Sequence, residues 1–288
     1  MNSAYLIHLG ITFAIQLILV SSFSFLLGGI GIPNLAHVST VAIGAYTSAL
    51  LSLHFGWPFF VTLGIATASG IVSGLLLAVL LRRVRSDYLA FLALEIQFLT
   101  TVVLLNWPSV TRGAFGLPGI PRPEGFATPP GYLILTASIA TAIILVYAAI
   151  LRSPYGRVMA AVRDDEVAGS AIGKRVPSVR MAAFLFASAG AAVGGALLAH
   201  YIQFIDPLTF SIHLLALALA GAIVGGVGSV PGMVAGTAII VFVPELLRRT
   251  AVGNPDVAGA LRQLAFALLI LLVLLLRPRG LFGKIDVR

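Results

Sequence analysis

AYLIHLGITFAIQLILVSSFSFLL, residues 4–27, contains no charged side chain and lies within a longer stretch, residues 1–81, that has no Lys, Arg, Asp or Glu. A helix of about 20 apolar residues crosses the hydrocarbon core of a bilayer. The run is longer than the apolar part of a secretory signal peptide, and no basic residue precedes it. We therefore expect residues 4–27 to form the first membrane-spanning helix and not a cleaved leader.

The rest of the chain has the same character. Of its 288 residues, 59% are hydrophobic and 10% are charged, and the mean hydropathy is +1.05. Soluble domains carry about 25% charged residues, so this composition excludes a soluble globular enzyme. The apolar runs lack the residue-by-residue alternation of barrel strands. The sequence predicts an all-α membrane protein, a polytopic bundle of about 8–10 transmembrane helices that forms a single domain over residues 1–288.

Short polar or Gly/Pro-rich breaks separate the apolar runs. The expected spans are 4–27, 34–53, 59–81, 88–106, 131–151 and 181–203, two spans within 207–244, and a last span at 260–276. The run 207–244 is divided because it is too long for one crossing. A Pro/Gly-rich loop at 107–130 and a hydrophilic segment at 152–180 complete the chain.

Two glycine breaks interrupt the apolar sequence, GGIGIP at residues 28–33 and GGVGSVPG at residues 225–232. Irregular backbone at membrane depth is tolerated only where protein or a water-filled cavity shields it, and in transporters such breaks often face the permeation path. An ordinary loop between two spans explains the same residues equally well.

The net charge of +8 comes from basic residues in the short breaks, and no basic patch interleaved with aromatic residues is present. We therefore expect no nucleic-acid partner. Basic residues concentrate on the cytoplasmic side of membrane proteins. With 152–180 in the cytoplasm, thirteen basic residues fall inside and five outside. This asymmetry predicts nine crossings, an external N-terminus, an external loop at 107–130 and a cytoplasmic C-terminus.

Sequence motifs for nucleotide, metal and nucleophilic chemistry are missing. The nearest approach to a phosphate-binding P-loop, GSAIGKR at 169–175, has the wrong spacing and lacks the Ser or Thr that contacts Mg²⁺. No HExxH or GxSxG motif occurs, cysteine is absent, and the five histidines are dispersed. We expect no catalytic residues, no metal and no cofactor.

Few polar residues lie inside the expected spans. Glu95 falls near the middle of span 88–106, where an unpaired charge costs about 2.5–3.5 kcal/mol or more. It should face the bundle or a wet cavity, or be protonated. Asn34 and His37 open the second span beside the first glycine break. These three are candidate pathway residues, and hydrogen bonding between neighbouring helices is the alternative role.

Segment 152–180 carries basic residues around a central acidic cluster, Asp164, Asp165 and Glu166. Pro154 and Gly156 break the preceding helix, and residues 157–172 contain no proline and read as one short helix with Gly173 suited to its C-terminal cap. A short charged helix between two spans is suited to docking a cytoplasmic partner. A solvated loop that only satisfies the charge asymmetry is the alternative.

The same segment carries a family resemblance. SPYGRVMAAVRDDE at 153–166, with Ala168 and Gly173, resembles the cytoplasmic loop of permease subunits of branched-chain amino acid ABC transporters, most closely the M-type of the two subunits. Seven further stretches agree in the same order: GAYT at 44–47, SDYLA at 86–90, GLPGIP at 116–121, AHY at 199–201, GGVGS at 225–229, PELL at 244–247 and RPRGLFG at 277–283.

The resemblance implies an importer for branched-chain or related amino acids in the plasma membrane of a bacterium or archaeon. Such permeases pair, usually as two different subunits, with two cytoplasmic ATP-binding subunits and a periplasmic or extracellular solute-binding protein, and some relatives carry urea or short amides. It assigns ATPase coupling to Pro154, Tyr155, Gly156, Arg157, Arg163, Asp164, Asp165, Glu166 and Gly173. The alternative is an ion-coupled secondary transporter or channel for a small polar solute, which would depend on Glu95 as its ion site.

Overall fold

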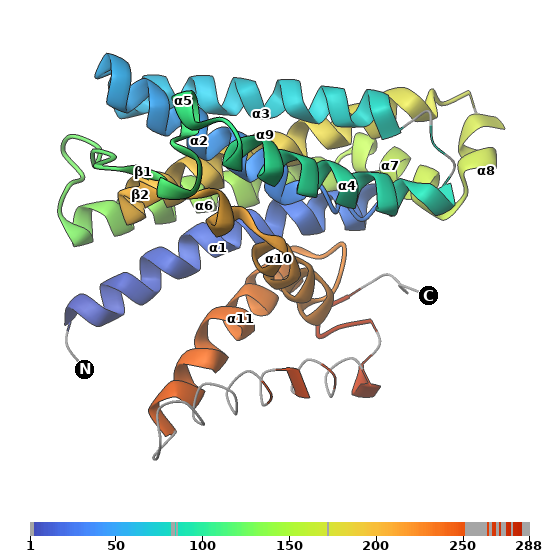
Figure 1. Ribbon diagram of the computed structural model, residues 1–288. Helices are drawn as coiled ribbons and strands as arrows, with labels where there is room; N and C mark the ends of the chain where they lie inside the picture. Colours follow the sequence, from blue (N-terminus) through green and yellow to red (C-terminus); the bar gives the residue numbers. More distant parts are fainter. Residues whose placement is uncertain are drawn as a thin grey trace.

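The computed structural model describes residues 3–81, 84, 86–171, 173–250, 264, 267–268, 271, 275–277 and 279–283. Within them the chain is a helical bundle with one two-stranded ribbon (Figure 1). The long helices are α1 (Ser3–Ile30), α2 (His37–Phe55), α3 (Phe59–Leu81), α4 (Ser86–Leu105), α6 (Pro129–Arg152), α9 (Val176–Ile202), α10 (Ile212–Gly225) and α11 (Val230–Thr250). The shorter elements are α5 (Pro108–Thr111), η1 (Gly113–Phe115), β1 (Leu117–Pro118), α7 (Pro154–Asp164), α8 (Glu166–Ala171), β2 (Phe204–Ile205) and η2 (Pro207–Phe210).

Seven segments of the described residues are long and apolar enough to cross a membrane. They are the helices α1, α2, α3, α4, α6 and α9 and the stretch Pro207–Gly225, which the shorter apolar helix Val230–Leu246 follows. The prediction of a polytopic all-α membrane protein is confirmed. The last expected span, 260–276, lies largely outside the described residues, and the orientation of the termini stays a prediction.

Helix α1 forms the centre of the bundle. In its most apolar window 89% of the residues are buried, against 33% for α3, 28% for α6 and 11% for α4. It contacts α6, α9, α10 and α11. A largely apolar helix that is enclosed in this way is held by packing against several neighbours. The outer helices α3, α4 and α6 leave one face uncovered within the chain.

Small residues bring α2, α3 and α9 into backbone contact. A Cβ added at Gly70 of α3 would lie 2.3 Å from the Cβ of Ala192 on α9, and one at Gly44 of α2 would lie 2.4 Å from the Cα of Ala192. In lipid, close van der Waals packing of this kind drives helix association. Helix α9 is thereby fixed against two membrane-spanning neighbours.

The two hydrophilic regions lie at opposite ends of the bundle. At one end β1 pairs antiparallel with β2, Leu117 opposite Ile205 and Pro118 opposite Phe204, which ties the loop after α4 to the end of α9. At the other end α7 and α8 connect α6 to α9 (Figure 1). This is the arrangement that the expected sidedness of 107–130 and 152–180 requires.

The first glycine break lies later than the sequence indicates. Helix α1 continues through Gly28 and Gly29 to Ile30, so the irregular backbone is 31–36, and α2 begins at His37 instead of residue 34. The glycines at 28 and 29 serve close packing, described below, and the turn itself begins at Gly31, whose φ is +75°.

The single helix expected at 157–172 is in fact two helices. Helix α7 already begins at Pro154, because the Ser153 hydroxyl accepts a hydrogen bond from the Gly156 amide and caps the helix. It ends at Asp164, because Asp165 adopts an extended conformation. The Asp165 carboxylate then accepts a hydrogen bond from the Val167 amide (2.8 Å) and starts α8.

Candidate coupling site and polar cavity

Helix α7 is attached to the bundle through one face. Gly156, Met159 and Val162, spaced three residues apart, are buried. A Cβ at Gly156 would lie 2.3 Å from a backbone carbonyl oxygen of α6, so any larger residue displaces the start of α7. The Tyr155 hydroxyl donates a hydrogen bond to the Val179 carbonyl of α9 (3.2 Å), and burial raises the pKa of this phenol. Contacts with α6 and α9 therefore fix the position of α7.

Arg163 joins α7 to the end of α1. Its Nη1 donates a hydrogen bond to the Gly28 carbonyl oxygen (2.7 Å), its Nε donates one to the Asp164 carboxylate (2.8 Å), and only 18% of its side chain is exposed. Gly28 belongs to the last turn of α1, where carbonyl groups lack a partner within the helix and the helix dipole favours a cation. Arg163 thus supplies the cation that the end of α1 favours.

The two glycine breaks meet at the end of α1. A Cβ at Gly28 would lie 2.5 Å from the Cα of Gly228, so the turn between α10 and α11 packs backbone to backbone on α1. Gly226 and Gly228 have φ values of +106° and +79°, which side chains with a Cβ rarely allow. A Cβ at Gly29 would lie 2.4 Å from the Cε of Met159 on α7. We call Gly28, Gly29, Gly226 and Gly228 the glycine junction.

Carboxy-terminal residues reach the glycine junction as well. The Leu281 amide donates a hydrogen bond to the Val224 carbonyl (3.0 Å), and the Phe282 amide donates one to the Gly225 carbonyl (2.9 Å). Four parts of the chain therefore meet at one end of the bundle: α1, α7, the α10–α11 turn and residues 280–283.

The outer side of α7 and α8 is exposed and charged. The acidic residues 164–166 are exposed at the break between the helices, and the neighbouring Val167 is 76% exposed. Glu166 forms an ion pair with Arg180 (2.8 Å), and a groove of about 530 Å³ lies between α8 and the start of α9. Val167 with the charged groups around it is compatible with a protein-binding surface, which combines an apolar centre with a polar rim. We call Arg157, Asp164, Asp165, Glu166 and Val167 the docking surface.

The nine residues assigned to coupling by the resemblance divide into two groups. Tyr155, Gly156 and Arg163 make the inward contacts described above. The exposed residues are Pro154, Arg157, Asp164, Asp165, Glu166 and Gly173. Gly173 has a φ of +76°, as expected of a glycine that follows a helix. The first group positions α7, and the second is available to a partner.

Asn34 and His37 are buried at the start of α2. The Asn34 Oδ1 accepts a hydrogen bond from the Ala36 amide (3.1 Å), an Asx turn that precedes the helix. His37 packs edge-on against Phe23 of α1, with ring centroids 5.5 Å apart, and its Nε2 has no hydrogen-bond partner in the described part of the chain. Protein encloses both side chains, so a pathway role requires the surrounding helices to separate.

Glu95 is not brought together with Asn34 and His37. It is exposed on the outer face of α4. On the opposite face Gln97 is buried and accepts a hydrogen bond from the Ser39 hydroxyl of α2 (3.0 Å). Facing the bundle was one of the environments expected for Glu95, but on this turn of α4 it is Gln97 that faces the other helices of the chain.

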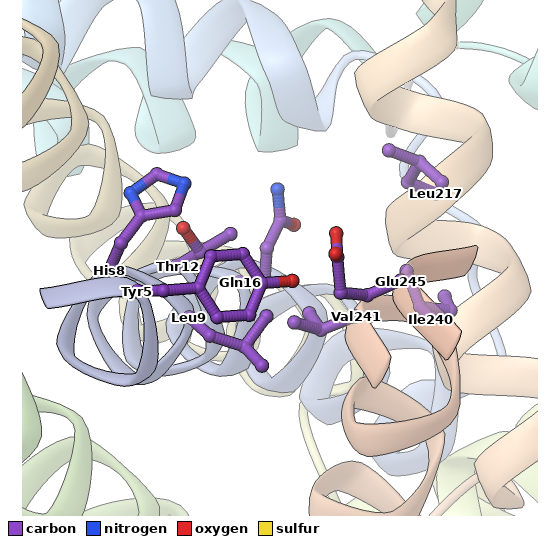
Figure 2. A pocket seen from close by; sticks show the side chains of 9 residues that line it. All are labelled: Tyr5, His8, Leu9, Thr12, Gln16, Leu217, Ile240, Val241 and Glu245. Carbon is purple, nitrogen blue, oxygen red and sulfur yellow. The ribbon is translucent and has the colours of Figure 1, made fainter. Parts of the chain in front are cut away.

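A cavity of about 220 Å³ opens between α1 and the α10–α11 pair (Figure 2). Its polar lining comes from Tyr5, His8, Thr12 and Gln16 of α1 and Glu245 of α11. The Gln16 amide and the Glu245 carboxylate extend toward the same space, and Gln16 Oε1 is buried without a hydrogen-bond partner among the described residues. The other lining side chains are aliphatic: Leu9, Leu217, Ile240 and Val241.

This cavity was not among the sites expected from the sequence. The only local pattern that indicates it is the recurrence of Tyr5, His8, Thr12 and Gln16 at intervals of three or four residues, which places polar groups on one face of α1. Glu245 lies more than 200 residues away, so no local pattern connects it with α1.

Comparison with known proteins identifies a family. The profile described as branched-chain amino acid transport system / permease component matches residues 5–276. The high-affinity branched-chain amino acid transport system permease protein LivM of Salmonella typhimurium is 29% identical over 93% of this chain and 67% of its own length. The corresponding LivH protein of Escherichia coli K12 is 28% identical over 98% of this chain and 94% of its own length. A probable LivM protein of Methanocaldococcus jannaschii is 24% identical over 98% and 93%. No solved structure matches the chain.

Proposed function

The chain belongs to the family of permease components of branched-chain amino acid transport systems, and from this premise we propose that two cytoplasmic ATP-binding subunits drive it through the docking surface. The chain is a multi-pass plasma-membrane protein and a permease subunit of an ABC importer. Because it has no P-loop motif, the ATP that drives transport is bound and hydrolysed on partner subunits.

One observation supports this coupling above the others, the hydrogen bond from Arg163 to the Gly28 carbonyl. ATP binding on another subunit can shift the balance between two states of the permease only through contacts that differ between them. Arg163 and Met159 lie on the docking helix α7 and contact the central helix α1 at Gly28 and Gly29. A subunit bound to α7 would therefore act on α1 directly.

The remaining partners follow from the same proposal. The relatives have two names, LivM and LivH, so the transport system has two permease proteins, and we place this chain beside a second permease of different sequence. The periplasmic or extracellular solute-binding protein would bind at the opposite end, around the β1–β2 ribbon and the loop that precedes it.

The solute we propose is an aliphatic amino acid, and the cavity between α1 and α11 fits its chemistry. A zwitterion presents an ammonium group, which Glu245 can bind, and a carboxylate, which can accept hydrogen bonds from Tyr5 and Gln16. The aliphatic lining matches a branched side chain. Asn34 and His37, beside the glycine junction, are proposed to contact the solute later in its path.

The alternative of an ion-coupled transporter or channel depended on Glu95 as an ion site. Glu95 lies on the outer face of α4, away from the cavity. The position of Glu95 therefore gives this second function no support.

The test uses the full complex, produced by coexpressing the tagged chain with candidate partner subunits, purified in mild detergent and reconstituted into liposomes. Val167→Arg places a charge at an apolar position of α8 that is 76% exposed and should reduce copurification of the ATP-binding subunits by about tenfold or more. Phe115→Arg is the matched control, because Phe115 is 86% exposed at the opposite end. Solute uptake by the purified chain alone, without ATP, would contradict the proposal.

A further inference from the structure

Helix α4 presents an uncovered stripe of large side chains. Only 11% of its most apolar window is buried, the lowest share among the candidate spans. Tyr88, Phe91, Glu95, Phe98 and Val102 are exposed and recur at alternating intervals of three and four residues. This spacing places them on one face of the helix, the pattern of a seam between two packed helices. We call these five residues the α4 seam.

The orientation of this face is fixed from the other side of α4. The Ser39 hydroxyl donates a hydrogen bond to Gln97 Oε1 (3.0 Å), and Gln97 Nε2 donates one to the Phe210 carbonyl (2.9 Å). Residues two apart on a helix are separated by about 200°, so anchoring Gln97 inward turns Glu95 outward. Rotating Glu95 into the bundle would break both of these buried hydrogen bonds.

Glu95 is also deep in the membrane. It lies nine residues after the start of α4 and ten before its end, which at 1.5 Å per residue is about 14–15 Å from either end. The hydrocarbon core is about 30 Å thick, so the short side chain does not reach the headgroups. In the described part of the chain the Glu95 carboxylate has no hydrogen bond or ion pair. A carboxylate in this position is strongly disfavoured against lipid.

The neighbouring outer helices differ from α4 in this respect. The exposed residues of α3 are all apolar, among them Val72 and Leu76. On α6 the exposed Ser138 and Thr141 hydroxyls donate to carbonyls of their own helix (2.8 and 2.7 Å). Both faces are compatible with lipid, whereas the α4 seam requires a partner that can pair with a carboxylate.

We propose that the α4 seam contacts the second permease subunit, which supplies a basic or amide side chain to Glu95 near the middle of the membrane. This inference rests on the proposed pairing of two permeases. A second copy of the same chain fits poorly, because a twofold axis along the membrane normal that pairs the seams brings Glu95 close to its own copy. Like charges at that depth repel, while a different sequence can place a donor opposite Glu95.

Photochemical cross-linking tests which molecule covers the α4 seam. We would place a photoreactive phenylalanine analogue at Leu99, which flanks the seam and is 61% exposed, or at Val102, and at Val72 or Leu76 of α3 as matched controls. Irradiation of membranes that contain the coexpressed complex should link the α4 positions to the second permease and the α3 positions to lipid alone. Adducts of the α4 positions with lipid only, with a second copy, or with residues 251–276 of the same chain would overturn the proposal.

Charge substitutions give an independent measurement. Glu95→Lys should reduce copurification of the second permease about tenfold, whereas Glu95→Gln, which keeps the shape and one acceptor, should stay within about twofold. Normal copurification with Glu95→Lys would contradict the inference. If the second permease copurifies but cross-links only to other helices, the seam is wrong and the proposed function stands. If no second permease copurifies with the unmodified chain, both are wrong.

Discussion

Arg163 has two partners, and replacing each in turn separates their roles. Arg163→Ala removes the hydrogen bond to the Gly28 carbonyl and the cation at the end of α1. A hydrogen bond to a charged group contributes about 1.5–3 kcal/mol, and a partly buried cation at a helix C-terminus up to about 2 kcal/mol. The two values describe the same contact and do not add, so we expect a loss of about 2 kcal/mol. This corresponds to about thirtyfold in the equilibrium that links α7 to α1.

The companion substitution is Asp164→Ala. The Arg163–Asp164 pair is largely solvated, since 66% of the Asp164 side chain is exposed, and exposed pairs contribute about 0–1 kcal/mol. Asp164→Ala should therefore leave the contact between Arg163 and Gly28 in place. Because Asp164 also belongs to the docking surface, its effect on coupling is compared only between complexes that retain their ATP-binding subunits. Arg163→Lys keeps the charge without the planar fork and should lie between the two.

The assay is solute uptake per ATP hydrolysed in liposomes that contain the complete complex. We expect Arg163→Ala to lower this ratio about tenfold or more while the ATP-binding subunits still copurify, because all five residues of the docking surface are retained. Equal impairment by Asp164→Ala in complexes that retain their ATP-binding subunits would refute the assignment to Gly28. Unimpaired coupling in Arg163→Ala would show that the contact between α7 and α1 does not transmit the ATPase cycle.

Three other predictions concern the glycine junction, the cavity and α4. Gly28→Ala should lower the thermal aggregation temperature in detergent, because the added Cβ would lie 2.5 Å from the Gly228 backbone and overpacking costs about 1–3 kcal/mol. Gly64→Ala is the control and should be neutral or stabilising, because a Cβ at Gly64 would have no atom within 4 Å. Glu245→Gln should reduce leucine uptake about tenfold by removing the charge opposite an ammonium group, whereas Thr141→Val on the outer face of α6 should not. Gln97→Leu should also lower the aggregation temperature, because the Ser39 hydroxyl and the Phe210 carbonyl lose their partner at about 1–3 kcal/mol.

Hydropathy located most of the fold because each span is an uninterrupted apolar run, a property of local sequence. The exact end of α1 could not be predicted, since glycine serves tight turns and close packing alike. At Gly28 the choice depends on Gly228, 200 residues away. The break between α7 and α8 at Asp165 could not be predicted either, because no proline marks it and the Asp165 side chain itself caps the next helix.

For the candidate site, too, local features could be predicted from the sequence and long-range contacts could not. The family resemblance located the coupling segment, and the preference of serine for helix N-caps was enough to predict Ser153 as the cap of its helix. The split of its residues into inward and exposed groups depends on the surfaces of α1, α6 and α9. For Glu95, hydropathy predicted the depth but not the direction, which the contacts of Gln97 determine.

Helix α1 connects the proposed solute cavity to the coupling site. Its 28 residues extend about 42 Å, and it is the most enclosed helix of the bundle. Tyr5 and Gln16 in its first half line the cavity, and Gly28 in its last turn contacts both Arg163 and the α10–α11 turn. On the proposed coupling, a displacement of α7 that is transmitted through Arg163 would act on the last turn of α1. The first half of the same helix lines the cavity opposite α10 and α11, so movement of α1 relative to these two helices would change the width of the cavity.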